Sequence, residues 1–239
     1  MRLTLITPYR DRLSHLKTQL DWWAGYAGKA AIEWLVIELT PDPSEPLPAL
    51  LQSHGIRYLH LPCVGPFHKT KALNVGLAQA QGELVAAFDV DLIPVGETLT
   101  RHCELAVRSP HLLLTGYRLM AATETVDVAD LGLALAQATL GPEDQPTALR
   151  KHLLAGERFG VMPLFWRDRL RAIGGWDEAF VGWGAEDQEL MERYLLPEQG
   201  FCRSPELVYL HLAHGLASDW NEAELTERNR AYYYWMRQI

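Results

Sequence analysis

Two aspartates stand one residue apart where an apolar run of the sequence ends. The run is LVAAF (84–88), and the acids that follow it are Asp89 and Asp91. In an extended chain residues i and i+2 face the same side, so both carboxylates can converge on one hard cation while Val90 points into the core. Such a cation offers its open positions to phosphate oxygens. The alternative is a strand-to-turn junction whose aspartates cap nearby amides.

A second group of reactive side chains lies in GGWDEAFVGWGAEDQELMERY (174–194). Glycines flank Trp183, so its indole can stand out from the backbone, and Glu186 and Asp187 begin a predicted helix that runs to about residue 195. An aromatic ring beside carboxylates commonly holds a sugar, because the ring covers the apolar face and the acids accept hydroxyl hydrogen bonds. The alternative is a buried tryptophan with ordinary acids in a first helical turn.

The elements that position these residues follow the alternating pattern of a βαβ sheet. Asp89 and Asp91 then lie at the carboxyl edge of a strand, where open α/β folds bind their ligands. Residues 121–150 have the weakest pattern, and we expect a helix there with a mobile acidic turn at GPEDQP. The predicted strands are 3–7, 32–39, 56–61 and 84–88, and the predicted helices are 11–24, 46–53 and 68–83.

Length and composition place limits on the class of protein. The chain has 239 residues, 48% hydrophobic and 22% charged, which is enough for the core of one domain. The net charge of −8 argues against nucleic acid or an anionic membrane as a partner held by general electrostatics. With no apolar run of about 18 residues and no signal-like start, we expect a cytoplasmic protein without a transmembrane segment. The three cysteines are far apart and predict neither a disulfide framework nor a zinc site.

Taken together, the two stretches resemble the β-1,4-galactosyltransferase family. FHKTKALNVGLAQAQGELVAAFDVDLIP and FVGWGAEDQELMERY occur in this order, and the opening ITPYRDR resembles the family's first-strand signature. The second motif is also similar to chondroitin-polymerase and polypeptide N-acetylgalactosaminyltransferase modules. The resemblance implies a single-domain α/β GT-A fold with a Rossmann-like mixed sheet, a nucleotide-binding half (1–100) and an acceptor-binding half (101–239). It further implies a UDP-sugar donor, manganese or magnesium, and inversion at the anomeric carbon.

The resemblance also implies roles for individual residues. Asp91 would bind the metal directly, together with His211 and His214 in VYLHLAHG, although a histidine pair at this spacing also occurs at surfaces and in cores. Asp187 occupies the general-base position. The positions implied for the acceptor and donor sugar are Trp183, Gly184, Glu186 and Asp187. The positions implied for the nucleotide are Pro8, Tyr9, Arg10, Arg12, Phe67, Lys69, Asp89 and Val90, where the arginines have the alternative of a solvated helix start.

The chain also departs from the galactosyltransferase pattern. Lys69 stands where the family tends to have arginine. The planar guanidinium group, which can form two hydrogen bonds with a phosphate, is thus replaced by an ammonium group that acts as a point charge. His211 replaces a methionine found in some members, and Gln188 follows the expected base, which leaves the acceptor open. The resemblance implies transfer of a hexosyl group, either galactosyl or N-acetylhexosaminyl. The acceptor would be the hydroxyl group of a carbohydrate or of another molecule.

Other classes of protein and other roles for the tail remain open. A non-catalytic sugar-binding module would keep Trp183, whereas a nucleotidyltransferase would need a glycine-rich first loop that is absent after LTLIT. A haloacid-type phosphatase ends its first strand in D-x-D, but here the motif lies late and continues with Leu92. We expect LASDWNEAELTERN (216–229) to be a lid or a plain C-terminal helix. The tail AYYYWMRQI can pack on the domain or form a homodimer or membrane-surface contact.

Overall fold

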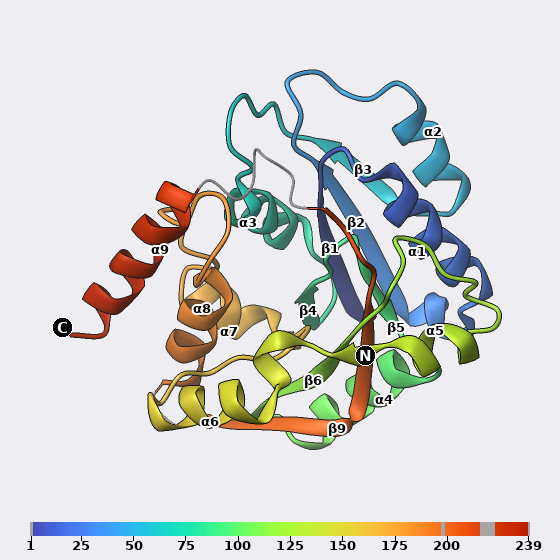
Figure 1. Ribbon diagram of the computed structural model, residues 1–239. Coiled ribbons are helices and arrows are strands. Elements are labelled where there is room, and N and C mark those ends of the chain that lie inside the picture. Colours follow the sequence, from blue (N-terminus) through green and yellow to red (C-terminus); the bar gives the residue numbers. More distant parts are fainter. Residues whose placement is uncertain (1, 197–198, 216–222, 239) are drawn as a thin grey trace.

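The first half of the chain folds into alternating strands and helices, as the sequence pattern predicts (Figure 1). The computed structural model describes residues 2–196, 199–215 and 223–238. Each strand and helix predicted for this half is present, with boundaries that differ by a few residues. The elements are β1 (Leu3–Tyr9), α1 (Leu13–Gly25), the 3-10 helix η1 (Ala27–Ala31), β2 (Ile32–Glu38), α2 (Pro46–Ser53), β3 (Arg57–His60), α3 (Lys69–Gln79) and β4 (Leu84–Ala87).

The second half adds short strands, one long strand and several helices. The helix predicted from Glu186 to about residue 195 is present as α8. The elements are β5 (Leu92–Pro94), α4 (Thr98–Arg108), β6 (Leu112–Met120), α5 (Gly132–Gln137), β7 (Thr139–Leu140), η2 (Pro142–Asp144), α6 (Pro146–Leu154), β8 (Phe165–Trp166), α7 (Arg167–Ala172), α8 (Glu186–Leu195), β9 (Gly200–His211) and α9 (Ala223–Met236).

A five-stranded sheet in the order β3-β2-β1-β4-β8 forms the centre of the molecule. The first four strands run parallel and β8 pairs antiparallel with β4, so the sheet is mixed, as expected. Strands β1 and β4 are neighbours, with Ile6 opposite Ala87. Their carboxyl ends therefore meet at one edge, which brings the segment after Tyr9 next to the segment that holds Asp89 and Asp91.

A second sheet, in the order β5-β9-β6-β7, continues from this edge. Strand β5 begins directly after Asp91 and pairs antiparallel with β9, which puts Leu92 opposite His211. The backbone N–H of Leu212 also donates to the carbonyl of Asp91, at 2.8 Å. This pairing joins the DVD segment to the histidine segment, which lies about 120 residues later in the chain.

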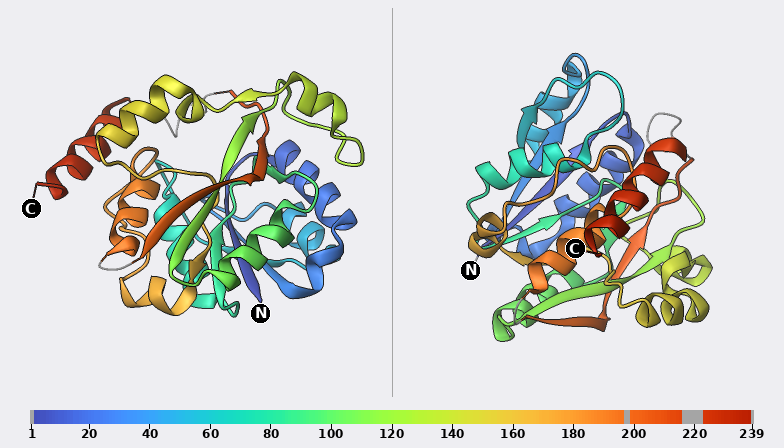
Figure 2. Two further views of the ribbon diagram at one scale, coloured as in Figure 1. Left: turned by 90° about the horizontal axis from the view of Figure 1, so that it is seen from below. Right: turned by 90° about the vertical axis from the view of Figure 1, so that its left-hand side faces the viewer.

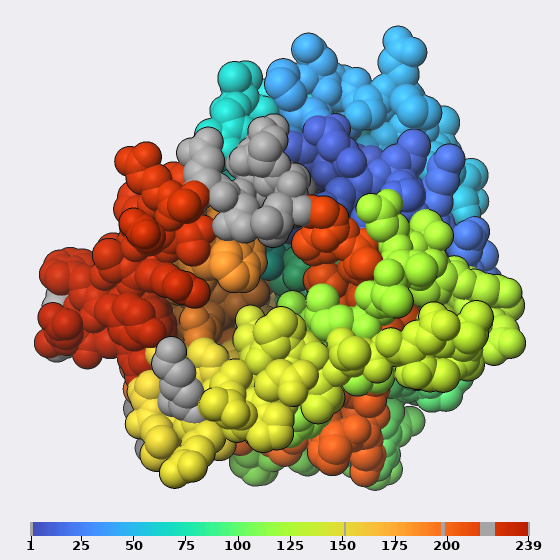
Figure 3. Space-filling model, in the orientation of Figure 1, coloured from blue at the N-terminus to red at the C-terminus, as the bar shows by residue number. Residues whose placement is uncertain are grey.

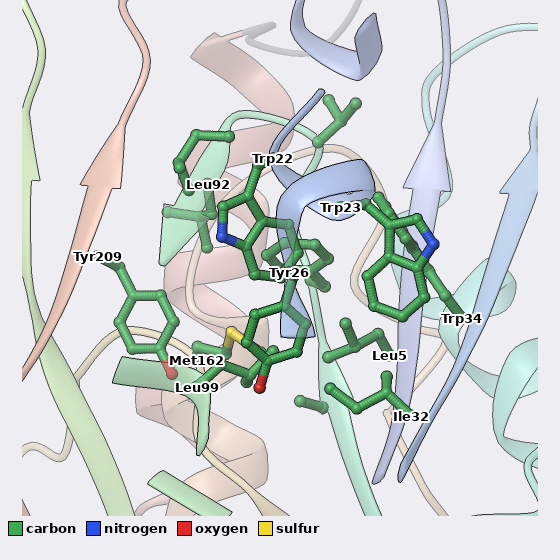
Figure 4. Close-up of a cluster of buried hydrophobic side chains, with 14 of the residues drawn as sticks. Leu5, Trp22, Trp23, Tyr26, Ile32, Trp34, Leu92, Leu99, Met162 and Tyr209 are labelled. Atoms are coloured by element: carbon green, nitrogen blue, oxygen red, sulfur yellow. The ribbon is translucent and has the colours of Figure 1, made fainter. Parts of the chain in front are cut away.

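The hydrophobic core has one part on each face of the central sheet, because side chains alternate along its strands. In β2, Trp34 and Val36 face α1 and α2, whereas Leu35 and Ile37 face α3. An aromatic cluster fills the first part, as Figure 4 shows for Trp22, Trp23, Tyr26 and Trp34. Burial of each such side chain stabilises the fold by about 1.5–3 kcal/mol relative to exposure. The sheet edge that carries the acids thus has rigid support.

The helix expected within residues 121–150 is present only as a short one. The segment contains the short α5, the two-residue β7 and the turn η2 before α6 begins at Pro146. The acidic turn at GPEDQP is also tied down: Glu143 pairs with Arg118 at 2.8 Å, and buried Asp144 forms an ion pair with Arg203. These partners come from β6 and β9, so local sequence does not reveal them.

The C-terminal end of α9 lies next to the turn that follows α6, on one flank of the molecule (Figure 2). Tyr234 of α9 donates its hydroxyl hydrogen to Glu157 at 2.8 Å, and Arg237 donates to the carbonyl of Ala155 at 3.0 Å. Residues 216–222 of the predicted lid lie outside the described residues, and 223–229 belong to α9. None of the helices that the structure describes combines the length and apolar character of a membrane span. All three cysteines are free.

Candidate active site

A cavity of about 460 Å³ opens where the carboxyl ends of β1 and β4 meet the start of α8. It lies on the face shown in Figure 3, which is hollowed between α9 and α6 on one side and the red segment after β9 on the other. Most of the predicted site residues line this cavity: Pro8, Arg12, Phe67, Lys69, Asp89, Val90, Asp91, Trp183, Gly184, Glu186, Asp187, His211 and His214. Buried Tyr9 and Arg10 do not line it, although they belong to the same predicted set.

The DVD segment is fixed by its backbone. The N–H of Phe88 donates to Ile6 of β1 at 2.8 Å, and the side chain of Gln19 donates to the carbonyl of Asp89 at 2.8 Å. Val90 is buried, as predicted. The chain turns here instead of staying extended, and the two carboxylates have different partners. Asp91 points inward, whereas Asp89 is half-buried and faces Lys69.

Asp91 forms a compact cluster with His211 and His214. One ligand atom from each residue lies within 4.8 Å of the other two, and the shortest distances from Asp91 to the Nε2 atoms are 3.5 Å for each histidine. The Oδ1 atom of Asp91 is buried, and none of the residues that the structure describes forms a hydrogen bond with it. Burial lowers the pKa of His211, against the nearby charge of Asp91, and so favours the neutral imidazole that binds metals. A carboxylate with two imidazoles suits manganese.

Neither arginine of the opening motif belongs to a solvated helix start, so that alternative was wrong. Arg12, at the N-cap of α1, pairs with Asp91 Oδ2 at 3.1 Å. Arg10 is buried, and its guanidinium donates to the carbonyl of Gly65 at 2.8 Å and also to Leu39. It lies 5.4 Å from the ring centre of Phe67. Arg10 therefore fixes the loop before α3 from the interior of the protein, and Phe67 of this loop forms part of the cavity wall.

Lys69 lies at the centre of three carboxylates. Its Nζ atom is 3.2 Å from Asp89, 3.3 Å from Glu186 and 3.5 Å from Asp187. Burial alone would lower the pKa of Lys69, but Asp187, Asp89 and Glu186 raise it well above its ordinary value. The lysine is therefore charged, and it connects the end of β4 to the start of α8.

The Gly-Trp-Gly segment has the exposed indole that its sequence predicts. Trp183 is 51% exposed, and its neighbours Gly182 and Gly184 have φ values of 78° and 116°, which favour glycine. The N–H of Gly184 donates to buried Glu186 at 3.0 Å. Burial raises the pKa of Glu186, and the adjacent carboxylate of Asp187 raises it further. Asp187 itself is half-exposed at the cavity wall.

The cavity also contains residues that sequence reasoning did not single out. They come from segments that are far apart in the chain, and Arg118 lies close enough to His211 and Asp89 for its charge to lower the pKa of both. Arg118 comes from β6, and several others come from α6, from the turn after it and from α9. The residues are Arg118, Glu143, His152, Glu157, Phe159, Arg230, Tyr233 and Tyr234. Their roles could be seen only when the fold brought 143–159 and 230–234 together.

Comparison with protein families gives a match in the second half of the chain. Residues 147–214 match the family model Glyco_transf_7C, which is described as an N-terminal domain of galactosyltransferase. The matched segment contains Trp183, Glu186 and Asp187 as well as both histidines of the cluster. It ends at His214.

Solved structures share the fold over nearly the whole chain. A mannosyltransferase from Pyrobaculum calidifontis, solved with GDP-Man and Mn2+, superposes with a TM-score of 0.61 at 17% identity, covering 90% of this chain and 58% of that one. GalNAc-T7 with UDP, GalNAc and Mn2+ has a TM-score of 0.67 at 11% identity, covering 98% and 47%. TarS of S. aureus has a TM-score of 0.61 at 17% identity, covering 89% and 37%.

The chain thus spans between about a third and three fifths of the length of these proteins. At such identities the likeness concerns the fold. Together with the galactosyltransferase match over residues 147–214, it gives this chain the GT-A fold of nucleotide-sugar glycosyltransferases.

Proposed function

We propose that the protein is a metal-dependent, inverting glycosyltransferase that moves a sugar from a UDP-sugar to an acceptor hydroxyl. One observation carries the proposal: Asp91, His211 and His214 form a metal-type cluster in the same cavity as a half-exposed carboxylate, Asp187. A binding module needs no such carboxylate, whereas a transferase needs both a site for the leaving diphosphate and a base for the acceptor.

The cluster fits manganese or magnesium as the resident ion. The buried Oδ1 of Asp91 supports this assignment: it has no hydrogen-bond partner within the described part of the chain, and a buried carboxylate oxygen without a partner costs free energy. The ion would stabilise charge on the departing diphosphate, which contributes several kcal/mol to such reactions. Arg12, which pairs with Asp91, adds a fixed positive charge at the same end of the cavity.

The nucleotide-sugar would lie along the edge formed by β1, the loop before α3 and the end of β4. Pro8, Phe67 and Val90 provide apolar walls there, and Asp89 provides an acceptor for hydroxyl hydrogens. Tyr9 and Arg10 support this edge from the interior. We propose uridine as the base and galactose or an N-acetylhexosamine as the sugar. The galactosyltransferase match and the UDP and GalNAc bound to GalNAc-T7 support both choices.

Asp187 would accept the proton of the acceptor hydroxyl as that hydroxyl attacks the anomeric carbon. Trp183, exposed beside it, provides a face on which a sugar acceptor can stack. Lys69 holds Asp187 and Glu186 in place. One displacement from the face opposite the phosphate inverts the configuration, so an α-linked donor yields a β-linked product. In this arrangement one cytoplasmic domain has its donor half in 1–100 and its acceptor half in 101–239.

The test is the Asp187→Asn variant, which keeps the size of the side chain but cannot take up a proton at neutral pH. Donor and manganese binding should survive, and transfer should fall by at least about 100-fold. Asp168→Asn is the matched control, since Asp168 is exposed and lies outside the cavity. Proton NMR of the product should show a β-linked anomeric coupling.

Three results would contradict the proposal. Full transfer by the Asn variant would remove Asp187 from the role of base, and an α-linked product would exclude a single displacement. If the wild type binds donor and manganese but transfers to no acceptor and does not hydrolyse the donor, the protein is the non-catalytic binding module instead.

A further inference from the structure

Four consecutive small or apolar residues are exposed to solvent at the end of α6 and directly after it. Leu153 and Leu154 are 63% and 79% exposed, and Ala155 and Gly156 after them are exposed as well. A run of this kind is unfavourable in water unless it serves a function. No partner from the described part of the chain covers it.

Helix α9 extends this apolar surface. Its Arg237 donates to the carbonyl of Ala155 and its Tyr234 to Glu157, so the two helices meet at the exposed run. Trp235, the next residue of α9, is 57% exposed. Because the Trp235 ring stacks on Tyr232, which contacts Asp177 before α8, we leave it out and call Leu153, Leu154, Ala155 and Tyr234 the α6–α9 patch. Exposed apolar surfaces of this kind mark sites of interaction with proteins or membranes.

The charges around the patch distinguish between occupants. Arg150 lies one helical turn before Leu153 and Leu154 and shares their face, since residues at i+3 and i+4 are neighbours on a helix. Arg158 follows the exposed run, and Arg230 lies one helical turn before Tyr234 on α9. Within the part of the chain that the structure describes, none of these three arginines forms an ion pair. The acids Glu224 and Glu227 are confined to the first half of α9.

We propose that the α6–α9 patch binds the surface of a lipid bilayer that contains anionic headgroups. Leucine and tyrosine side chains enter the boundary between headgroups and acyl chains, while the arginines reach lipid phosphates. The net charge of −8 does not prevent this, because charges beyond about 8 Å are largely screened at physiological ionic strength. A symmetric contact with a second copy would instead bring the same arginines face to face.

Binding in this orientation also explains where the cavity lies. His152 and Tyr234, which belong to or adjoin the patch, line the cavity as well. The mouth of the cavity is therefore next to the membrane surface. Binding of the patch to a bilayer does not depend on the proposed transferase reaction.

The experiment is co-sedimentation of the whole chain with vesicles of phosphatidylcholine, alone or mixed with phosphatidylglycerol. The wild type should partition onto the mixed vesicles, and the Leu153→Ser/Leu154→Ser variant should lose at least about 10-fold in partition coefficient. Arg150→Gln should lose about 5-fold on mixed vesicles only. Leu196→Ser is the matched control, because Leu196 is 69% exposed but follows the far end of α8; it should bind like the wild type.

Several outcomes would overturn the proposal. The wild type failing to bind either vesicle, or binding as tightly when both leucines are serine, would remove the patch from membrane attachment. A concentration-dependent dimer in light scattering that the double serine variant abolishes would assign the patch to a second copy. Circular dichroism melts of the variants check that each one folds, and the exposure of the substituted residues favours wild-type stability.

Discussion

Asp91 joins three parts of the chain that sequence alone keeps apart. It follows β4, pairs with Arg12 at the start of α1, and lies 3.5 Å from both His211 and His214. Its neighbour Asp89, two residues earlier, has a different environment, in which Lys69 is the partner. The two acids of one motif thus have separate tasks: one belongs to the metal-type cluster and the other to the lysine-centred group.

The first prediction concerns this cluster. Asp91→Ala should abolish manganese-dependent binding of a UDP-sugar, and His211→Ala should raise the manganese concentration needed for half-saturation by at least about 10-fold, because ligands at such sites contribute that much or more to affinity. His111→Ala is the control, since His111 is an exposed histidine outside the cavity. Isothermal titration calorimetry with donor and manganese provides the readout. Metal titrations that coincide for wild type and both variants would exclude the cluster as the metal site.

The second prediction concerns Lys69. Lys69→Met keeps a long, unbranched side chain at this position but removes the positive charge next to buried Glu186 and Asp187. We expect a loss of about 2 kcal/mol in the free energy of unfolding at neutral pH, below the 3–5 kcal/mol of a fully buried pair because two of its carboxylates are partly exposed.

The pH dependence of this loss has a definite sign. Without the lysine, the folded-state pKa of Glu186 lies further above its unfolded value, so the folded variant takes up a proton before the unfolded chain does, and the deficit should shrink as pH falls toward the ordinary pKa of a glutamate. Lys71→Met, an exposed lysine on the same helix, should cost less than about 0.5 kcal/mol. Urea unfolding at neutral and acidic pH measures both. A deficit that grows on acidification would contradict this account.

At the scale of elements, the local sequence pattern predicted the helices and strands whose packing partners are near in sequence. Helix α2 matches its predicted range, and α8 begins at Glu186 as its acidic first turn suggests. The second sheet was not predicted, because β6 and β9 pair across some 90 residues and β5 has only three residues. The same limit applies to the site: the chain order of Lys69 and Asp187 gives no sign of a contact across 118 residues.

The third prediction concerns the packing of α4 between β6 and β9. His102 is buried; its Nε2 lies 3.0 Å from the carbonyl of Leu114 and its Nδ1 lies 2.8 Å from the hydroxyl of Tyr209. A carbonyl only accepts, so Nε2 carries the hydrogen and the Tyr209 hydroxyl donates to Nδ1. Burial lowers the pKa of His102 to about 4. Protonation would therefore break a contact that holds three elements together.

The sign of the resulting pH dependence follows from linkage. The unfolded chain binds this proton near about pH 6.5, and the folded chain only near pH 4. The neutral His102 therefore makes its full contribution to the free energy of unfolding above the unfolded-state pKa, and this contribution falls as pH decreases from there to about 4. His102→Gln should flatten the pH dependence of the free energy of unfolding in this window, whereas His111→Gln should leave it unchanged. An identical pH dependence for wild type and His102→Gln, by urea unfolding, would contradict a buried neutral histidine.

At the scale of the whole molecule, the cavity joins the first strand to the last helix. Pro8 and Tyr234 line the same space, and Asn229 of α9 donates to the carbonyls of Val181 and Trp183 in the loop before α8. Ligand that fills the cavity therefore contacts residues from nearly the full length of the chain. Its binding free energy adds to the stability of the entire fold, because the unfolded chain has no cavity.

The last prediction uses this coupling to identify the donor. A UDP-sugar with manganese, at 100 times its dissociation constant, should stabilise the protein by about 2.7 kcal/mol, which corresponds to a rise of roughly 5–10 °C in Tm for a chain of this length. The nucleotide-sugar alone should shift Tm much less, since the metal and the diphosphate bind at the same end of the cavity. A panel of UDP- and GDP-sugars, each with and without manganese, ranks the donors. Asp91→Ala should lose the manganese-dependent part of the shift, and Asp187→Asn should keep it. Equal shifts with and without manganese would mean that the donor binds without the Asp91 cluster, and a shift with GDP-sugars alone would exclude uridine as the base.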